Sequence, residues 1–193
     1  MTTTAVTPKT PSGPGAIRNR TATRHIVVVI AAAALVYLFA LVHGQWSPMH
    51  RWNRAFGDAA VLLLALTMSL GAVSRLIRPT AKWLPFRREL GIYAVVLASV
   101  HTVIILDGWV EWNLFRLFGM EFHPVDLQYV MVQHGFALAN GIGFLALGIG
   151  FILLLTSSDR AVRYLGGTSW KTVQMTALVF WALVVAHTAY FLY

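Results

Sequence analysis

The residues with the clearest chemical potential in this 193-residue chain are its histidines. The chain has seven histidines and no cysteine. Without cysteine it can form no disulfide, no thiolate nucleophile, no Cys-ligated iron–sulfur cluster and no covalently attached c-type haem. Any metal must therefore be held by histidine, a carboxylate, methionine or backbone oxygen, and neutral imidazole is a good ligand for iron. Two of the histidines, His101 and His187, lie inside long apolar segments.

The composition places these apolar segments in a membrane. The chain is 58% hydrophobic and only 11% charged, whereas a soluble domain carries about 25% charged residues. Asp, Glu, Lys and Arg are absent between residues 24 and 51, 89 and 107, 126 and 159, and after 171. Runs of about 18 or more such residues are typical of membrane-spanning helices. The chain is therefore expected to cross the lipid bilayer several times.

We expect an all-α membrane protein whose transmembrane helical domain, residues 21–193, is a five-helix bundle. The predicted helices cover residues 25–44, 57–76, 89–107, 134–156 and 170–192. Only sixteen residues separate Asp58 from Arg75, so the second helix must extend into the interface or thin the bilayer. Residues 1–20 are rich in Thr and Pro with little to bury, which predicts a disordered cytoplasmic tail.

The distribution of basic residues predicts the orientation. Of the 15 Lys and Arg residues, 12 lie in the N-terminal tail and in the connections after the second and fourth helices, and 3 lie in the connections after the first and third. Because cytoplasmic loops carry the basic excess, this predicts a multi-pass inner-membrane protein with a cytoplasmic N-terminus and an external C-terminus. The net charge of +8 is then a topology signal, and nucleic acid is not an expected partner.

In this orientation His101 and His187 reach the same depth of the outer half. Each lies six residues before the outer end of its segment, at Asp107 and Tyr193, which corresponds to about 9 Å of helix. An ionisable residue in the hydrocarbon region is a functional hypothesis by default. The two imidazoles could share one metal or haem between the helices, or each could hydrogen-bond a neighbouring helix. The residues alone leave both explanations open.

The fourth predicted helix is unusually rich in glycine. Its glycines are Gly141, Gly143, Gly148 and Gly150, which recur at seven-residue spacing. Two explanations are open: close packing against a neighbouring helix, or a surface left flat for a macrocycle.

The longest connection, residues 107–133, is expected on the outer side. Its aromatic residues recur at steps of three and four: Trp109, Trp112, Phe115, Phe118 and Phe122. This spacing predicts an outer-side interfacial amphipathic helix anchored at the membrane surface. A docking face for an external partner is the alternative.

Three groups of short motifs occur in a fixed order along the chain. They are Phe86-Arg87-Arg88-Glu89-Leu90-Gly91-Ile92-Tyr93 followed by His101-Thr102, then Ser157-Ser158-Asp159-Arg160 with Leu165-Gly166 and Trp170, and finally His187-Thr188-Ala189-Tyr190. Together they resemble the ferric-reductase-like transmembrane domain family over roughly residues 50–193. Within that family, the resemblance is greatest to the haem-binding membrane subunits of the periplasmic methionine sulfoxide reductase system.

The resemblance implies that histidines on the third and fifth helices bind b-type haem. It makes His101 and His187 the axial ligands of one outer-leaflet haem b. It also implies that the protein takes electrons from quinol or a flavin and delivers them to an external redox protein. Apart from the resemblance, the position of Arg51 and Arg54 on the outer side leads us to expect that one of them meets the haem propionates. Family members commonly carry a further histidine thirteen residues before the last one, where this chain has Gln174. Glutamine is a poor haem ligand, which argues against a second, inner haem.

The sequence therefore predicts a b-type haem-binding membrane subunit that carries electrons to an external redox partner. It would be an electron-transfer part of an oxidoreductase rather than a complete enzyme. A second hypothesis is a non-catalytic accessory or scaffold subunit of a larger membrane complex, and a third is a quinone-binding membrane protein without a metal. On the cytoplasmic side, Arg75, Arg78 and Arg88 fit a quinone or FMN site, or anchoring to anionic lipid.

Overall fold

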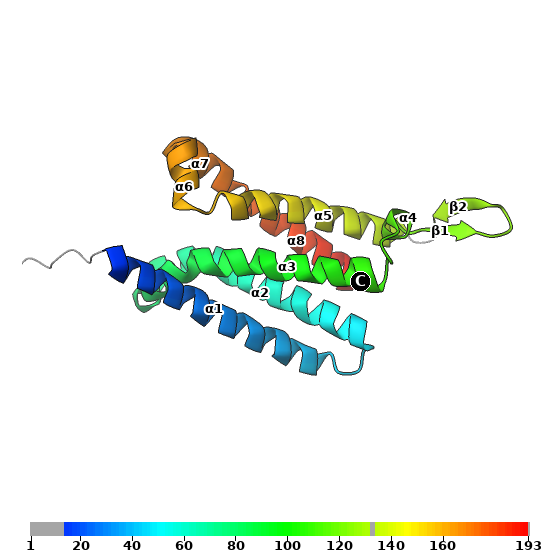
Figure 1. Cartoon of the computed structure of the whole chain (residues 1–193), viewed down its shortest axis with the longest axis horizontal. Coiled ribbons are helices and arrows are strands. Elements are labelled where there is room, and N and C mark those ends of the chain that lie inside the picture. Colours follow the sequence, from blue (N-terminus) through cyan, green and yellow to red (C-terminus); the bar gives the residue numbers. More distant parts are fainter. Residues whose placement is uncertain (1–13, 132–133, 193) are drawn as a thin grey trace, which may run out of the picture.

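The computed structural model describes residues 14–131 and 134–192. Within that part of the chain, five segments are helical and are long and apolar enough to cross a membrane. They are α1 (Pro14–Val42), α2 (Pro48–Leu76), α3 (Arg87–Gly108) after the 3₁₀ helix η1 (Arg78–Phe86), α5 (His134–Leu155), and α7 (Gly167–Met175) continued by α8 (Ala177–Leu192). The predicted all-α membrane protein with five spans is confirmed (Figure 1).

Helix α2 begins at Pro48, nine residues before the predicted start of the second span. Proline at the first helical position has a backbone φ that suits a helix start, and the helix then continues through Arg51, Arg54 and Asp58. Its 29 residues are more than the roughly 20 that a bilayer requires. The shortness of the uncharged run is therefore explained by charged residues that lie inside the outer part of the helix.

Two other helix ends also differ from the prediction. Helix α1 begins at Pro14, so residues 14–20 of the expected disordered tail are helical, and residues 1–13 lie outside the described part of the chain. The last predicted helix is divided at Thr176, which caps α7 before α8 begins.

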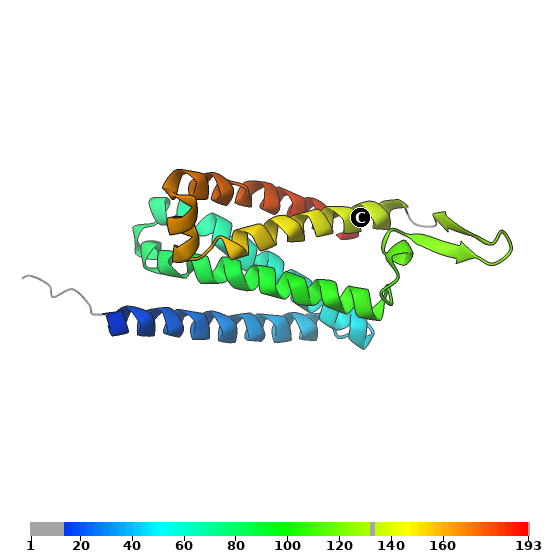
Figure 2. The ribbon, with the colours of Figure 1, turned by 45° about the horizontal axis from the view of Figure 1, so that its top comes forward.

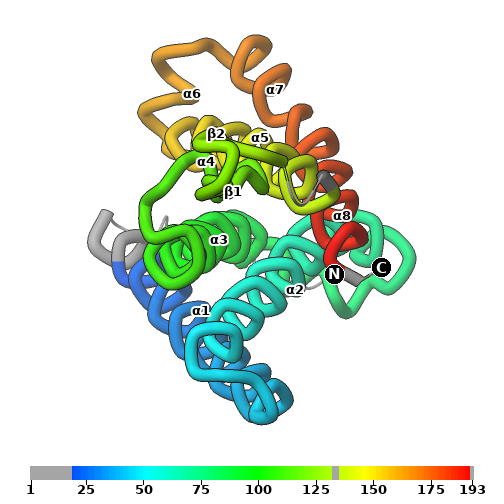
Figure 3. Tube along the Cα trace, turned by 90° about the vertical axis from the view of Figure 1, so that its right-hand side faces the viewer, coloured from blue at the N-terminus to red at the C-terminus, as the bar shows by residue number. Residues whose placement is uncertain are grey.

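The bundle consists of two antiparallel helix pairs with α1 against one side (Figures 2 and 3). Helix α2 packs along α3, α5 packs along α8, and contacts between α3 and α5 join the pairs. Where α1 meets α2, Ala40, Ala55 and Ala59 are fully buried, because small side chains let helices in a membrane approach closely. Larger buried side chains such as Leu63 and Phe180 fill the space between the pairs.

The two ends of the bundle carry different connections. The start of α1, η1 and the short helix α6 (Asp159–Leu165) lie at one end in Figure 1, and the turn between α1 and α2 lies at the opposite end with the connection after α3. This arrangement agrees with the predicted alternation of basic and less basic connections. Helix α6 begins where the Ser158 side chain accepts a hydrogen bond from the Ala161 amide, and it ends at Gly166 with φ of 77°.

The prediction of an amphipathic helix in the outer connection is wrong. The chain forms instead the four-residue helix α4 (Leu114–Leu117) and a hairpin of β1 (Met120–His123) and β2 (Gln128–Met131). The hairpin is antiparallel and projects beyond the bundle in Figure 1.

Backbone conformation explains why the aromatic spacing does not produce a helix. Glu111 and Trp112 have φ of 51° and 58°, and Gly119 has φ of 69°, which are outside the right-handed helical region. The aromatic residues contact one another across the connection: the rings of Phe115 and Tyr129 stack at 4.2 Å. The hairpin therefore brings Tyr129, which was not among the aromatic residues of the predicted helix, onto the ring of Phe115.

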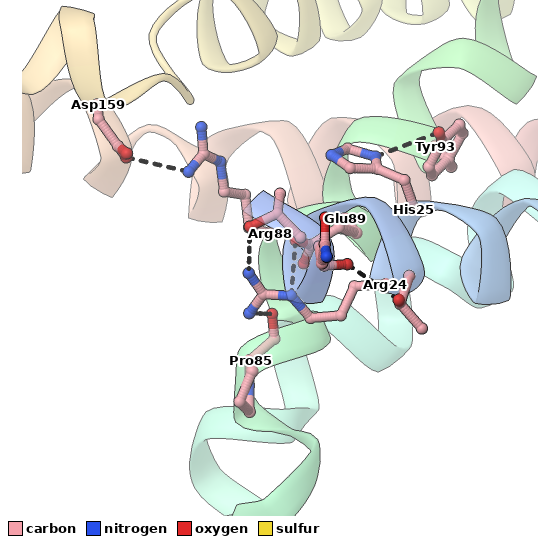
Figure 4. Close-up of polar contacts among 10 residues, drawn as sticks. Arg24, His25, Pro85, Arg88, Glu89, Tyr93 and Asp159 are labelled. Atoms are coloured by element: carbon pink, nitrogen blue, oxygen red, sulfur yellow. Dashed lines mark hydrogen bonds and ion pairs between the residues drawn. The ribbon is translucent and has the colours of Figure 1, made fainter. Parts of the chain in front are cut away.

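A buried ion pair joins α1 to α3 near the end of the bundle that carries η1 (Figure 4). The Arg24 Nε lies 3.3 Å from Glu89 Oε1, and Glu89 is only 1% exposed. Arg24 Nη1 also donates to the Pro85 carbonyl at 3.1 Å, and His25 contacts the Tyr93 hydroxyl. Glu89 lies in the first turn of α3, where the helix dipole stabilises an anion.

Removing the cation of this pair should destabilise the protein. In Arg24→Met the Glu89 carboxylate stays buried without its partner, and we expect a loss of about 3–5 kcal/mol in denaturant unfolding of the protein in detergent micelles. The double variant Arg24→Met/Glu89→Met should recover most of that loss, because a buried pair can be replaced by apolar residues. Asp159→Asn, which breaks the exposed Arg88–Asp159 pair, is the control and should cost about 0–1 kcal/mol. Equal losses in the control and in Arg24→Met would contradict the assignment.

Candidate functional site

The structure brings together His101, near the C-terminal end of α3, and His187, near the C-terminal end of α8. Their ring centroids are 6.3 Å apart and the ring planes lie at 87° to each other. Both residues are half-buried. The two histidines singled out from the sequence therefore face each other across the interface between the helix pairs.

Each imidazole is held by a backbone carbonyl of the partner helix in its own pair. His101 Nδ1 lies 2.9 Å from the Asn53 carbonyl of α2, and His187 Nδ1 lies 2.8 Å from the Ala139 carbonyl of α5. A carbonyl only accepts, so each Nδ1 carries the proton and donates it, and each Nε2 keeps its lone pair. Within the described residues, neither Nε2 has a hydrogen-bond partner. Both rings therefore present an atom that can bind a metal.

A glycine faces each imidazole one turn along the same partner helix. A Cβ atom on Gly57 would lie 3.0 Å from His101 Nδ1, and one on Gly143 would lie 2.7 Å from both Nδ1 and Cε1 of His187. The distance at Gly143 is too short for a Cβ atom, and the distance at Gly57 would require the His101 ring to shift by a few tenths of an ångström. The glycines are thus part of the cradle that positions the histidines.

The two helix pairs repeat the same arrangement. In each pair the histidine lies 48 positions after the residue whose carbonyl it contacts, and the facing glycine lies four positions after that residue. A threonine follows each histidine, and the hydroxyls of Thr102 and Thr188 donate to carbonyls one turn earlier. Sequence reasoning missed Asn53, Gly57 and Ala139, although the equal glycine-to-histidine spacing in both halves could have indicated them.

Comparison with known proteins places this arrangement in a family. Residues 56–185 match the family described as ferric reductase like transmembrane component. The chain belongs to this family. The resemblance inferred from the sequence motifs is therefore confirmed. The match begins in α2 and ends in α8 two residues before His187, so it covers both helix pairs and leaves α1 outside.

Two curated relatives are magnetosome proteins. Magnetosome protein MamZ of Magnetospirillum gryphiswaldense is 27% identical over 173 residues, which is 84% of this chain and 24% of the relative. Magnetosome protein MamZ of Paramagnetospirillum magneticum is 26% identical over the same shares. The chain thus spans about a quarter of the length of the curated relatives it matches. No solved structure matches the chain.

The glycines of α5 in this ferric-reductase-like chain divide into two groups. Gly143 faces the imidazole of His187, and a Cβ on Gly150 would lie 3.2–3.3 Å from Phe180 and Val95. Gly141 and Gly148 face open space. Close helix packing therefore accounts for Gly150, whereas Gly143 makes room for the ring of a histidine.

The arginines predicted to meet haem propionates make contacts elsewhere. Arg51 Nε donates to the Ala40 carbonyl at 2.6 Å, where it supplies a cation near the C-terminal end of α1. The Arg54 guanidinium lies 4.3 Å from the ring centroid of Trp46. Among the contacts that the structure describes, neither arginine reaches His101 or His187.

Other ionisable residues form separate small groups. His43 Nε2 lies 2.7 Å from Asp58 Oδ2, His123 pairs with Asp126 in the hairpin, and His50 lies between the rings of two tryptophans. Sequence reasoning placed Asp58 at a helix end, but it lies ten residues inside α2. In the part of the chain that is described, no three His, Asp or Glu side chains gather into a metal site. The facing pair on α3 and α8 is therefore the strongest candidate for cofactor chemistry.

Gly143→Ala should displace His187 from its position. The new Cβ would lie 2.7 Å from the ring, so we expect a loss of about 1–3 kcal/mol in unfolding of the detergent-solubilised protein. Gly141→Ala on the same helix meets open space and should be neutral or stabilising by about 1 kcal/mol or less. Equal stabilities of the two variants would show that the close approach of Gly143 to His187 does not hold the helix pair.

Proposed function

We propose that the chain is a b-type haem-binding membrane subunit that carries electrons to an external redox protein. The proposed site for one haem lies between His101 and His187 in the outer half of the bundle. The observation that carries the proposal is the facing pair of imidazoles, each with its Nδ1 proton committed to a carbonyl and its Nε2 without a partner. Membership of the ferric-reductase-like family supports a redox role in the membrane.

The residues present fit a haem at this position. Imidazole nitrogen binds divalent metals at about 2.0–2.1 Å, so one ion shared by both rings needs ring centres about 6 Å apart once the ring radii are added. The observed separation is 6.3 Å. His101 and His187 would be the two residues that hold the haem.

The protein's own residues would set the properties of the site. A bound haem would supply one-electron chemistry by cycling between ferric and ferrous iron. The hydrogen bonds from Nδ1 to the carbonyls of Asn53 and Ala139 fix the ring orientation and raise the basicity of Nε2. The apolar bundle around the pair limits access of water, and such burial is one of the factors that tune the potential of haem iron.

We further propose that the protein lies in the inner membrane with its N-terminus in the cytoplasm. The 12 to 3 division of basic residues supports this orientation, which puts the histidine pair near the external face. Electrons would then enter from a quinone or FMN on the arginine-rich side, near Arg75, Arg78 and Arg88. The Arg88 side chain on that side already pairs with Asp159 at 3.1 Å.

The haem proposal predicts a spectrum that depends on both histidines. Purified wild-type protein should give a reduced-minus-oxidised spectrum of b type, and His101→Ala and His187→Ala should each abolish it, because each removes one of two axial ligands. His123→Ala, in the hairpin and away from the pair, is the matched control and should keep the full signal. A wild-type protein that binds no haem when haem is supplied during expression would refute the proposal and favour the accessory-subunit hypothesis.

The proposed orientation can be tested with single cysteines, because the natural chain has none. Val125→Cys at the hairpin tip and Tyr164→Cys on α6 replace residues that are 81% and 90% exposed. We expect a membrane-impermeant thiol reagent to label the first variant in intact cells and the second only after the inner membrane is permeabilised. The reverse labelling pattern would invert the topology and place the histidine pair on the cytoplasmic side.

A further inference from the structure

We infer that electrons leave the histidine site through a chain of aromatic rings that ends under an acidic pocket, and that this pocket docks a basic redox protein. The inference rests on the proposed function, since it concerns the exit of the same electrons. The step is a one-electron transfer, in which the site loses one electron and the oxidised centre of the partner gains it. No bond forms or breaks.

Three consecutive ring contacts connect His187 to the outer end of the bundle. The His187 and Phe191 centroids are 5.1 Å apart, those of Phe191 and Phe136 are 6.1 Å apart, and those of Phe136 and Trp109 are 6.4 Å apart. The rings come from α8, α5 and the residue that ends α3. Three separate elements therefore converge to make one continuous aromatic path.

The path ends at the wall of a pocket on the outer side. A cavity of about 310 Å³ is lined by Trp109 and Phe136 together with Glu111, Arg116 and Glu121. Trp109 is 44% exposed, so its ring connects the buried path with the surface. A protein partner that contacts this pocket would touch the last ring of the path directly.

The charge around the pocket is opposite to that of the chain as a whole. Residues 107–131 contain four acidic residues and one basic residue, although the protein carries a net charge of +8. The single base, Arg116, is neutralised by Glu111 at 2.8 Å. Within the described residues Glu121 has no ion-pair partner. An acidic patch attracts a basic protein and speeds its association.

The same charge argues against the bilayer as the occupant of this surface. Anionic lipid headgroups repel an acidic segment, and the hairpin that carries Glu121 projects away from the bundle (Figure 1). A basic, soluble protein satisfies both the charge of the pocket and its position at the external face. The partner would bring its redox centre to the Trp109 ring.

The test uses the full-length protein in nanodiscs and an oxidised basic c-type cytochrome as the probe. Binding is measured at several salt concentrations, and oxidation of the dithionite-reduced protein is followed by stopped flow. Glu111→Gln/Glu121→Gln should weaken cytochrome binding and slow association roughly 10-fold at low salt, with little change at high salt. Asp126→Asn, in the hairpin turn and outside the pocket, should have a much smaller effect than the double variant.

The aromatic path is tested with Trp109→Leu, which should slow electron delivery several-fold without changing cytochrome binding or the haem spectrum. Trp109→Phe keeps a ring and should restore most of the rate. Trp112→Leu removes an exposed tryptophan of the same connection that is not part of the path, and should leave the rate unchanged.

Two results would overturn the inference independently of the haem proposal. Unchanged cytochrome binding in Glu111→Gln/Glu121→Gln would exclude the pocket as the docking surface, and a spin label at Val125→Cys that becomes buried in lipid would assign the hairpin to the membrane. An unchanged rate in Trp109→Leu would exclude the path. Absence of a haem spectrum in wild type would refute the proposed function, whereas the binding measurement would still decide whether the pocket docks a basic protein.

Discussion

The half of the bundle that holds the histidine pair depends on one contact, in which an imidazole on one helix donates a hydrogen bond to a backbone carbonyl of its partner helix. The contact needs room beside the partner helix, and Gly57 and Gly143, which lack a Cβ, provide it next to His101 and His187. It sets how closely α2 approaches α3 and α5 approaches α8. Because both helix pairs use the same contact, the two rings meet at one depth and face each other.

The sequence was sufficient to predict the histidine pair but not the atoms that hold it. Charge counts and distances from segment ends gave the depth of His101 and His187, because depth along a membrane helix is proportional to residue number. The carbonyls of Asn53 and Ala139 could not be predicted in this way. Their role depends on how each helix is rotated about its axis and on which helices are neighbours, and a nearly uniform apolar surface contains little information about either.

Charged residues caused the main errors in helix limits. The second helix was predicted to begin at residue 57, yet Arg51 and Arg54 also lie inside α2. Each charged residue of this segment has a local partner: the Ala40 carbonyl for Arg51, the Trp46 ring for Arg54 and His43 for Asp58. In the outer connection the error was of the opposite kind. Aromatic periodicity suggested a helix, but three residues with positive φ break the chain into α4 and a hairpin.

The repeat of the two helix pairs also allows the half of the bundle near η1 to be compared with the half that holds the histidine pair. Arg88 and Gln174 occupy equivalent positions, each thirteen residues before the histidine of its pair. Both side chains reach the connection that follows α5, since Arg88 pairs with Asp159 and Gln174 donates to the Thr156 hydroxyl. The positions of Arg88 and Gln174 thus join helices, whereas the histidines that face each other lie 13 residues further along the chain. The potential for metal chemistry is concentrated on the side of the bundle where the aromatic path begins.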